Sequence, residues 1–437
     1  MPKPEIIGAI DVGSGQIVCA IGRKKDEQDQ VDVIAATKQP CRGLKGGVVI
    51  NIDETALAIG RVVEAAEEMA KETVRDLIIG IRGNHIQTFN HHGAINIART
   101  DKEITADDVT QVIESTKAVP ISTDREIIHV IPQDFVLDRQ QGVPNPVGME
   151  GSLLEVQVHI VTAGSNHLNN IWRAINNGGF GIREPIYGLL ALGDVVVTQE
   201  EKDLGCLLVD LGGASTGMAV YVDGSVCFTK ELSIGTDTIT NDLAHGLRTS
   251  FSQAKMVKER YGAAVRTARR PVLVSGSGME ESIALDEEVN YTSVDGRTQK
   301  KIQMNTLFDF ISPRVEEIYS LLQEEIHNSG LSEQIVAGGV ILTGGGSMMP
   351  GMVEAAEKIL ELPARHGLPQ NITGLADIIS HPTYATAVGL LSFQSMGDWS
   401  RGHKGGRGKP GSMIGNIKGF FSDLSISLIS SSLFKYS

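Results

Sequence analysis

Residues 6–21 read Ile-Ile-Gly-Ala-Ile-Asp-Val-Gly-Ser-Gly-Gln-Ile-Val-Cys-Ala-Ile, and residues 206–221 read Cys-Leu-Leu-Val-Asp-Leu-Gly-Gly-Ala-Ser-Thr-Gly-Met-Ala-Val-Tyr. Each stretch is an apolar run, an aspartate, a turn of small residues and a second apolar run, which is typical of two buried strands joined by a tight turn. The recurrence of such a unit indicates two similar half-molecules. We therefore expect an α/β protein with two related halves.

The two turns carry residue types that suit a nucleotide. Asp11 and Asp210, on matching turns that face each other, would hold Mg²⁺ through its water shell beside the phosphates. Glycines have no side chain, so their backbone N–H groups can approach phosphate oxygens, and neighbouring hydroxyls add donors. The candidate phosphate-binding residues beside the two aspartates are Gly13, Ser14, Gly15, Gly212, Gly213, Ser215 and Thr216.

A third glycine loop strengthens this interpretation. Gly344, Gly345 and Gly346 follow a strand pattern at 340–343 and precede a helical pattern over 352–360. The N-terminus of a helix favours an anion. One Asp-Gly turn is more often only a turn, but two in register with a third loop favour a nucleotide site. The chain has no GxxxxGK[ST] loop, and no GxGxxG opens a helix after the first strand, so P-loop and Rossmann sites are not expected.

The composition restricts the class of protein. Lys and Arg number 39 against 53 Asp and Glu, and the net charge of −14 argues against nucleic acid as a partner. A chain of 437 residues exceeds one ordinary core, so at least two packed units are expected. The four cysteines form no CxxC pair and predict neither a disulfide framework nor a zinc site, which fits a reducing, intracellular compartment.

Residues 83–162 have a different sequence pattern from the segments on either side and predict an inserted α+β subdomain. Thr105 and Asp108 form a capping-box pattern for a helix that we expect to reach about residue 118, and strand patterns follow over 126–161. His85, His91 and His92 could bind a metal, but tandem polar histidines are usually surface residues. Before the insert, Asp53 is the expected N-cap of a core-facing helix that runs to Ala70.

The end of the chain predicts a flexible basic linker and an amphipathic helix. Residues 396–412 contain six glycines and the cations Arg401, Lys404, Arg407 and Lys409. An apolar stripe follows at Ile414, Ile417, Phe420, Phe421, Leu424 and Leu428. Such a stripe commonly packs on its own protein, but the linker favours binding to a membrane surface. No run of about 18 apolar residues and no secretory signal occurs, so neither a span nor secretion is expected.

These loops resemble those of the actin-like ATPase superfamily, which includes Hsp70-type chaperones, sugar kinases and bacterial filament proteins. The loops at 11–15, 210–216 and 343–347 are similar to its two phosphate loops and its adenosine loop, and segments 184–189 and 385–390 resemble its two connecting helices. The resemblance implies two RNase H-like halves around a nucleotide cleft. It also implies that Glu184, with Asp210, acts in catalysis by polarising water; a surface glutamate before a helix-starting Pro185 is the alternative.

Within the superfamily the chain resembles the FtsA family of bacterial cell-division proteins over nearly its whole length. The matching segments are residues 145–151, 233–242, 258–262, 369–375 and the amphipathic tail. This resemblance implies that Gly235 and Lys258 approach the β-phosphate and the sugar or base. One departure is Lys255, where relatives carry an acidic residue that serves ribose binding. A second is the Ser-rich extension over residues 425–437.

The resemblance also implies function. It predicts an ATP- and Mg²⁺-binding protein, at most a weak ATPase, that polymerises at the division site on the cytoplasmic face of the membrane and anchors the tubulin-like protein FtsZ there. Arg297 and Arg314 match positions implicated in binding the FtsZ C-terminal peptide, although a solvated surface arginine is the simpler interpretation of each. The insert would contact other protomers and division proteins. A phosphotransferase of the sugar-kinase type is the alternative, but we see no second acidic motif that could supply a base.

The expected organisation follows from these segments. Actin-like domain I covers 1–82 and 163–197, with the insert at 83–162 between them. Domain II covers 198–235 and 311–395, and its small subdomain covers 236–310. The linker at 396–412 and a membrane-targeting tail at 413–437 complete the chain.

Overall fold

The computed structural model describes residues 5–24, 31–271, 280–282, 287–370, 372–375 and 381–393. The chain divides into two compact units, residues 1–392 and 393–437. The described helices and strands all belong to the first unit. The predicted linker and the membrane-binding residues Ile414, Ile417, Phe420, Phe421 and Leu424 lie outside the described residues.

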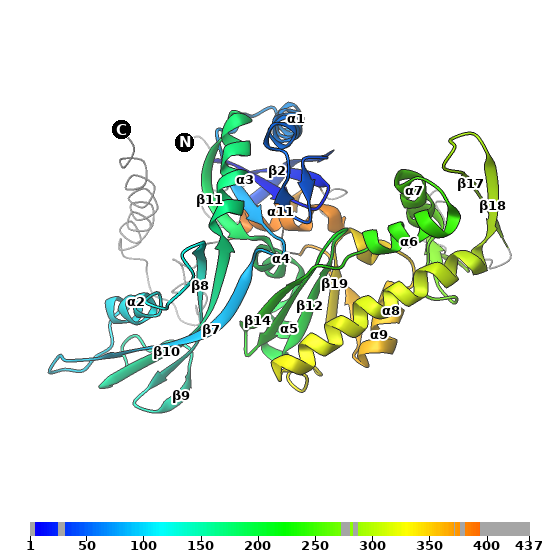
Figure 1. Ribbon diagram of the computed structural model, residues 1–437. Helices are drawn as coiled ribbons and strands as arrows, with labels where there is room; N and C mark the ends of the chain where they lie inside the picture. The colour runs from blue at the N-terminus through cyan, green and yellow to red at the C-terminus, as the bar shows by residue number, and fades with distance from the viewer. Residues whose placement is uncertain are drawn as a thin grey trace. The chain divides into compact units, whose positions relative to one another are not determined.

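Two sheets with the same strand arrangement form the two halves (Figure 1). The first has the order β11-β6-β1-β2-β3-β21, and the second β14-β13-β12-β19-β20. In each, three strands form an antiparallel meander and two further strands add in parallel on one side; the first sheet also has the short strand β21, parallel to β3. The first sheet comprises β1 (Ile6–Val12), β2 (Gln16–Lys24), β3 (Val31–Pro40), β6 (Asp76–Ile81), β11 (Gly181–Tyr187) and β21 (Thr373–Gly374); the second comprises β12 (Cys206–Leu211), β13 (Thr216–Val222), β14 (Ser225–Leu232), β19 (Val340–Thr343) and β20 (Ala364–His366). The predicted duplication is therefore confirmed.

Helices α4 (Gly188–Val196) and α11 (Pro382–Ser392) connect the halves. Helix α11 packs on β1, β2 and β6 of the first sheet, α4 packs on β13 of the second, and the two helices contact each other. Gly389 allows this contact, because a Cβ atom there would lie 2.3 Å from the carbonyl oxygen of Ala191. The outer faces carry α1 (Ile52–Ala70) and α3 (Ser165–Asn177) in the first half, and α8 (Met304–Ser329) and α9 (Met352–Leu360) in the second; α5 (Gln199–Leu204) precedes β12.

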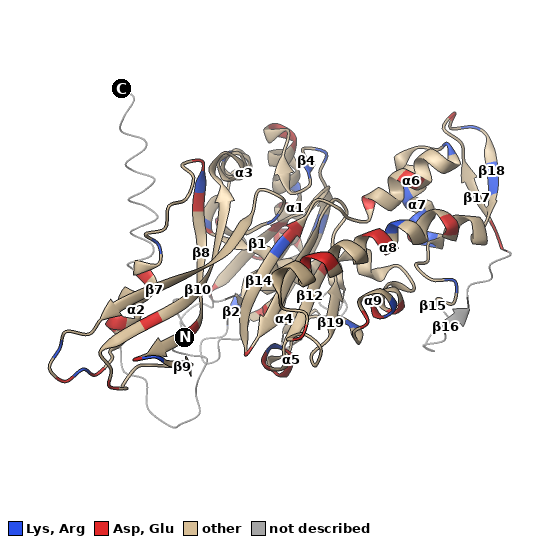
Figure 2. Ribbon diagram, turned by 60° about the horizontal axis from the view of Figure 1, so that its bottom comes forward, with Lys and Arg blue, Asp and Glu red and all other residues tan. Residues whose placement is uncertain are grey.

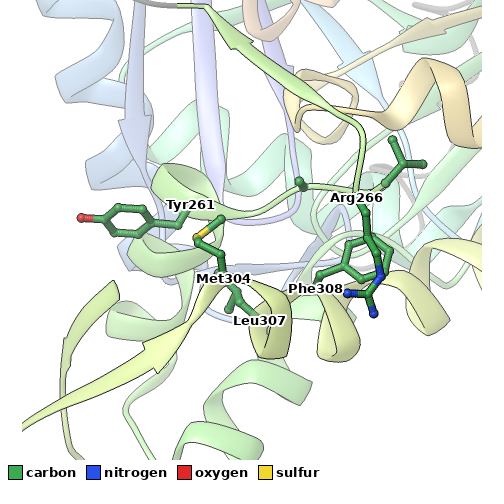
Figure 3. Close-up of a pocket in the computed structure, with 7 residues that line it drawn as sticks. Tyr261, Arg266, Met304, Leu307 and Phe308 are labelled. Atoms are coloured by element: carbon green, nitrogen blue, oxygen red, sulfur yellow. The ribbon is translucent and has the colours of Figure 1, made fainter. Parts of the chain in front are cut away.

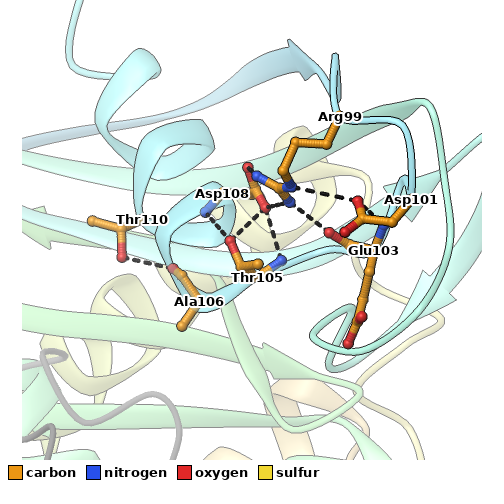
Figure 4. A network of polar contacts seen from close by, with 7 residues as sticks. All are labelled: Arg99, Asp101, Glu103, Thr105, Ala106, Asp108 and Thr110. Atoms are coloured by element: carbon orange, nitrogen blue, oxygen red, sulfur yellow. Dashed lines mark hydrogen bonds and ion pairs between the residues drawn. The ribbon is translucent and has the colours of Figure 1, made fainter.

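The insert is a four-stranded antiparallel sheet with one helix. Its elements are β7 (Gln87–Asn96), α2 (Ala106–Ser115), β8 (Arg125–Leu137), β9 (Gln140–Val143) and β10 (Leu153–Gly164). The predicted capping box is present, and Arg99 also binds Asp108, with a 3.1 Å contact to its Oδ1 (Figure 4). The insert contacts the second half, where Thr88 Oγ1 donates to the Thr229 carbonyl at 2.7 Å.

A small subdomain follows β14. It contains α6 (Asp237–Leu247), α7 (Phe251–Tyr261), the strands β15 (Arg269–Pro271) and β16 (Glu280–Ser282), and the hairpin of β17 (Glu288–Thr292) and β18 (Gln299–Gln303). Two further short strands, β4 (Leu44–Lys45) and β5 (Val48–Val49), lie before α1. Buried apolar side chains of α6, α7 and α8 continue the core beneath the second sheet.

Four local predictions need correction. The N-cap of α1 is Asn51, whose side chain accepts the Glu54 N–H, while Asp53 lies in the first turn. Helix α2 ends at Ser115 instead of residue 118. Pro185 lies within β11 instead of opening a helix, and it is tolerated because β11 is an edge strand. His85 is buried, not at the surface: its ring stacks on His167 with centroids 4.7 Å apart, and burial lowers its pKa to about 4.

The contact between the connecting helices makes a testable prediction. We expect Gly389→Ala to destabilise the fold by about 1–3 kcal/mol, because the new methyl group collides with the α4 backbone. The matched control is Gly60→Ala in α1, where a Cβ atom meets nothing within 4 Å. That substitution should stabilise the protein by about 1 kcal/mol through helix propensity alone. Urea denaturation of both variants measures the difference, and equal shifts in the same direction would contradict the packing argument.

Candidate functional site

The carboxyl ends of three strands bring the two predicted aspartates together. Asp11 lies near the end of β1, opposite Gly80 of the parallel strand β6, and Asp210 lies near the end of β12, opposite Thr343 of β19. Arg82 directly follows β6 and forms an ion pair with Asp210. Because neighbouring parallel strands have their carboxyl ends at the same end of a sheet, the strand pairing fixes the positions of both carboxylates.

The first and second glycine loops have the same backbone turn. The Gly13 N–H donates to the Gln16 carbonyl at 3.1 Å, and the Gly212 N–H donates to the Ser215 carbonyl at 3.0 Å. At the tip of the first turn Ser14 is half-buried and Gly15 is exposed, and a Cβ atom at Gly15 would meet nothing within 4 Å. The internal repeat in the sequence is thus also a repeat in geometry.

The second loop rests on the turn that contains Gly235. The Thr236 N–H donates to the Gly212 carbonyl at 3.0 Å, and a Cβ atom at Gly235 would lie 2.4 Å from the Gly213 carbonyl oxygen. Lys258 reaches this turn from α7, and its Nζ donates to the Thr236 carbonyl at 2.8 Å. Burial lowers the pKa of Lys258 to about 8. The structure therefore brings Gly235 and Lys258 to the predicted site.

Thr216 and Ser215 close the second loop at the start of β13. Thr216 is fully buried, and its Oγ1 donates to the Ile234 carbonyl at 2.7 Å. The Thr216 hydroxyl therefore secures the loop against the following turn. Ser215 is half-buried, and its carbonyl closes the loop by accepting the Gly212 N–H.

The third glycine loop meets the second at Asp210. Gly344 has a φ of 83°, and a Cβ atom there would lie 2.0 Å from Asp210 Oδ1. Residues Gly345–Met348 form a 3-10 helix, η1, before α9 begins at Met352, so the predicted helix start is preceded by this extra turn. Gly346 packs against Thr236, whereas a Cβ atom at Gly345 would meet nothing within 4 Å. The second and third loops thus meet at the Asp210 carboxylate.

Three residues of the site were not singled out from the sequence: Arg82, Glu231 and Tyr187. Arg82 Nε lies 3.6 Å from Glu231 Oε1, and the Tyr187 hydroxyl donates to the same oxygen at 3.1 Å. Arg82 gave no signal in the local pattern, because it comes near Asp11 only through the parallel pairing of β6 with β1. Glu231 gave no such signal, since it reaches the site only through the pairing of β13 with β14.

The polar atoms at this site are incompletely satisfied within the described part of the chain. Asp11 Oδ1, Glu231 Oε2 and Thr343 Oγ1 are buried and have no hydrogen-bond partner there. Burial raises the pKa of the Asp11 carboxyl to about 6, against the opposing charge of Arg82. Buried unpaired acceptors are costly and call for a donor or a cation. These atoms and the glycine cradle fit a phosphate group with an associated cation, although the described residues form no metal-ligand cluster of three or more His, Cys, Asp or Glu residues.

Other predicted site residues lie elsewhere. Glu184 in β11 is opposite Ile78 of β6, whereas Asp11 in β1 is opposite Gly80 of β6. Glu184 is therefore two strands away from Asp11 and two residues nearer the start of these parallel strands. Arg297 is exposed between β17 and β18, and Figure 2 shows the basic residues of β18. Arg314 of α8 binds Asp242 of α6 through Nε and Nη2, at 2.8 and 3.3 Å. Neither arginine takes part in the carboxylate cluster described above.

A separate pocket lies in the second half, and none of its lining residues belongs to the carboxylate cluster (Figure 3). Tyr261, Met304, Leu307 and Phe308 line it, and the guanidinium of Arg266 stacks on Phe308 at 4.4 Å from the ring centroid. All four cysteines are free thiols, as the sequence indicated.

Comparisons with known proteins agree on one family. A family model described as "SHS2 domain inserted in FTSA" matches residues 83–162, and one described as "Cell division protein FtsA" matches residues 207–389. The FtsA proteins of Pseudomonas aeruginosa and Neisseria meningitidis are each 36% identical to this chain, over 389 and 385 residues. These alignments cover 89% and 88% of this chain, and 89% of each relative. FtsA of Escherichia coli is 30% identical over 396 residues, which are 89% of this chain and 90% of the relative.

Solved structures agree on the fold. A chain of the PilM-PilN type IV pilus biogenesis complex has a TM-score of 0.62 at 14% identity, covering 88% of this chain and 97% of that one. MreB5 of Spiroplasma citri, bound to ADP, has a TM-score of 0.50 at 11% identity, covering 88% of this chain and 94% of that one.

Within the described parts of the chain, none of the helices combines the length and the apolar character that crossing a bilayer requires. The strand order of the two halves, the position of the insert and the extent of identity to curated relatives all lead to the same conclusion. The chain belongs to the FtsA family of cell division proteins and has an actin-like fold.

Proposed function

We propose that this protein binds ATP with Mg²⁺ between its two halves, polymerises at the cytoplasmic face of the cell membrane, and anchors the division ring there by binding FtsZ. The observation that carries the nucleotide part is the pair of aspartates on matching loops, of which Asp11 has a buried Oδ1 without a hydrogen-bond partner in the described chain. The family supplies the division role, and the sequence of the tail supplies the membrane part.

Different site residues would contact different parts of the bound nucleotide. Bound Mg²⁺ would neutralise phosphate charge, with Asp11 and Asp210 accepting hydrogen bonds from its water shell. The N–H groups of Ser14, Gly15 and Gly213 would face phosphate oxygens, whereas those of Gly13 and Gly212 close the two turns. The hydroxyls of Ser14 and Ser215 would add donors. Gly235, Lys258 and the loop Gly344–Gly346 would complete the site toward the β-phosphate and the nucleoside. A lysine whose pKa is lowered to about 8 is still mostly protonated at neutral pH and suits an anion.

We expect the protein to act by contacting its partners, and not by rapid turnover of ATP. Hydrolysis needs a positioned water, and Glu184 is the proposed polarising residue, with Asp210 beside the phosphates. The described residues around Asp11 offer no second substrate pocket that we recognise, which disfavours transfer to a small metabolite. The insert and the exposed hairpin of β17 and β18 are the proposed surfaces for other protomers, division proteins and the FtsZ C-terminal peptide.

The nucleotide proposal predicts the effect of removing each carboxylate. Asp11→Asn and Asp210→Asn should each weaken MgATP binding at least about tenfold, measured by fluorescent-nucleotide titration. Asp11→Asn should do so without lowering Tm at pH 7, because the folded state raises the pKa of Asp11 and so disfavours its charge. Asp53→Asn, at an exposed position in α1, is the control. Wild-type affinity in both site variants would contradict the proposal.

The partner proposal separates the two arginines. Arg297→Glu should weaken binding of the FtsZ C-terminal peptide about tenfold in fluorescence anisotropy, because an exposed cation becomes an anion. Arg314→Ala should weaken binding of the peptide and should also lower Tm, since Asp242 loses its ion-pair partner. Arg61→Glu on the exposed face of α1 makes the same charge change elsewhere and should bind like the wild type. Undiminished binding by Arg297→Glu would exclude that residue from the contact.

The tail proposal is tested with anionic liposomes. The full chain should sediment with them, whereas a chain ending at Ser412 and the variant Phe420→Glu should stay in the supernatant, because each removes apolar area that enters the headgroup region. Ser422→Glu places the same charge outside the apolar stripe and should still sediment. The basic linker residues would add up to about 1 kcal/mol each near an anionic surface. Equal sedimentation of full and truncated chains would refute the anchor.

A further inference from the structure

Arg82 crosses from one half of the protein to the other. It belongs to the first half, directly after β6, yet its guanidinium pairs with Asp210 and lies 3.6 Å from Glu231, both in the second half. Its side chain is only 12% exposed. It is therefore a largely buried cation at Asp210, close enough to Asp11 for its charge to oppose the rise in the pKa of that carboxyl.

Two glycines leave room for this side chain. A Cβ atom on Gly188, at the start of α4, would lie 3.1 Å from Arg82 Cγ. A Cβ atom on Gly217, in β13, would lie 2.6 Å from Arg82 Nη2. Neither glycine has a positive φ, so backbone conformation does not demand glycine at these positions. The need is for space, and it arises from the path of Arg82 between α4 and β13.

The charges around Arg82 do not balance. Asp11, Asp210 and Glu231 provide three carboxylates against one guanidinium, and the Glu231 side chain is only 1% exposed, with Oε2 lacking a hydrogen-bond partner among the described residues. Removing water from such a group is costly unless a cation compensates. Arg82 supplies one positive charge, whereas a divalent metal would supply two.

We infer that Arg82 serves as the resident cation of this carboxylate cluster, and that Arg82 would leave Asp210 for phosphate oxygens when a nucleotide with Mg²⁺ is held there. This inference rests on the proposed nucleotide site. The released guanidinium has five donors in a planar fork, which matches phosphate oxygens. Arg82 is then a positioning residue, because binding of a nucleotide would change the ion pair between Arg82 and Asp210 that joins the two halves.

The test uses the full chain without nucleotide. Thermal unfolding is followed in EDTA and in MgCl₂ at equal ionic strength, for the wild type, Arg82→Ala and Arg82→Lys. Arg82→Ala should have a lower Tm in EDTA, because three carboxylates lose their cation. Mg²⁺ alone should raise its Tm by about 1–2 °C at ten times the Kd of the new site. The wild type and Arg82→Lys should show no such rise, since a cation already fills the place.

The control is Arg365→Ala, which removes an arginine from a two-point contact with the single carboxylate of Glu201. It should lower Tm without any gain from Mg²⁺. If Arg82→Ala is unfolded in EDTA, refolding on addition of Mg²⁺, seen by circular dichroism, is the same positive result. No gain from Mg²⁺ in Arg82→Ala, or an equal gain in all variants, would overturn the inference.

A parallel titration of wild-type protein with MgATP separates the two proposals. If MgATP binds the wild type and Arg82→Ala gains nothing from Mg²⁺, the role of Arg82 is wrong and the nucleotide site stands. If MgATP does not bind but Arg82→Ala gains Mg²⁺ stabilisation, the nucleotide proposal fails while the role of Arg82 as resident cation is upheld.

Discussion

The parallel pairing of β1 with β6, and of β12 with β19, is the constraint on which the site depends. The two strands of each pair have their carboxyl ends at the same end of the sheet. The residue opposite Gly80 and the residue opposite Thr343 therefore lie at that end. Those residues are Asp11 and Asp210. The first two glycine loops turn the chain back into the next antiparallel strand at these ends. Helices α4 and α11 join the two halves through their close contact.

Much of this arrangement could be predicted because it depends on local pattern. Alternation of apolar runs with Asp-Gly turns indicated the two hairpins, and the repeat itself indicated two halves. The capping box of α2 was readable from Thr105 and Asp108, since both partners lie within one turn of helix. The chain positions of the three glycine loops were also correct, because each loop directly follows a buried strand.

The rest could not be read from local pattern. Glu231 joins the site through cross-strand pairing, and Arg82 joins it through an ion pair that spans 128 residues. His85 looked polar and exposed, but α3 returns to this region much later in the chain and supplies His167 as a stacking partner. Pro185 looked like a helix start, yet its strand continues to Tyr187 because an edge position does not require its N–H group.

The contact between the insert and β14 has a consequence for assembly. Strand β14 is an edge of the second sheet, and side chains of the insert bind its backbone: Asn90 Nδ2 donates to the Cys227 carbonyl at 3.1 Å, and Gln133 Nε2 to the Val226 carbonyl at 2.9 Å. An exposed edge strand is a template on which another chain can add a strand. The insert therefore occupies backbone carbonyls of this edge strand that an added strand would otherwise use.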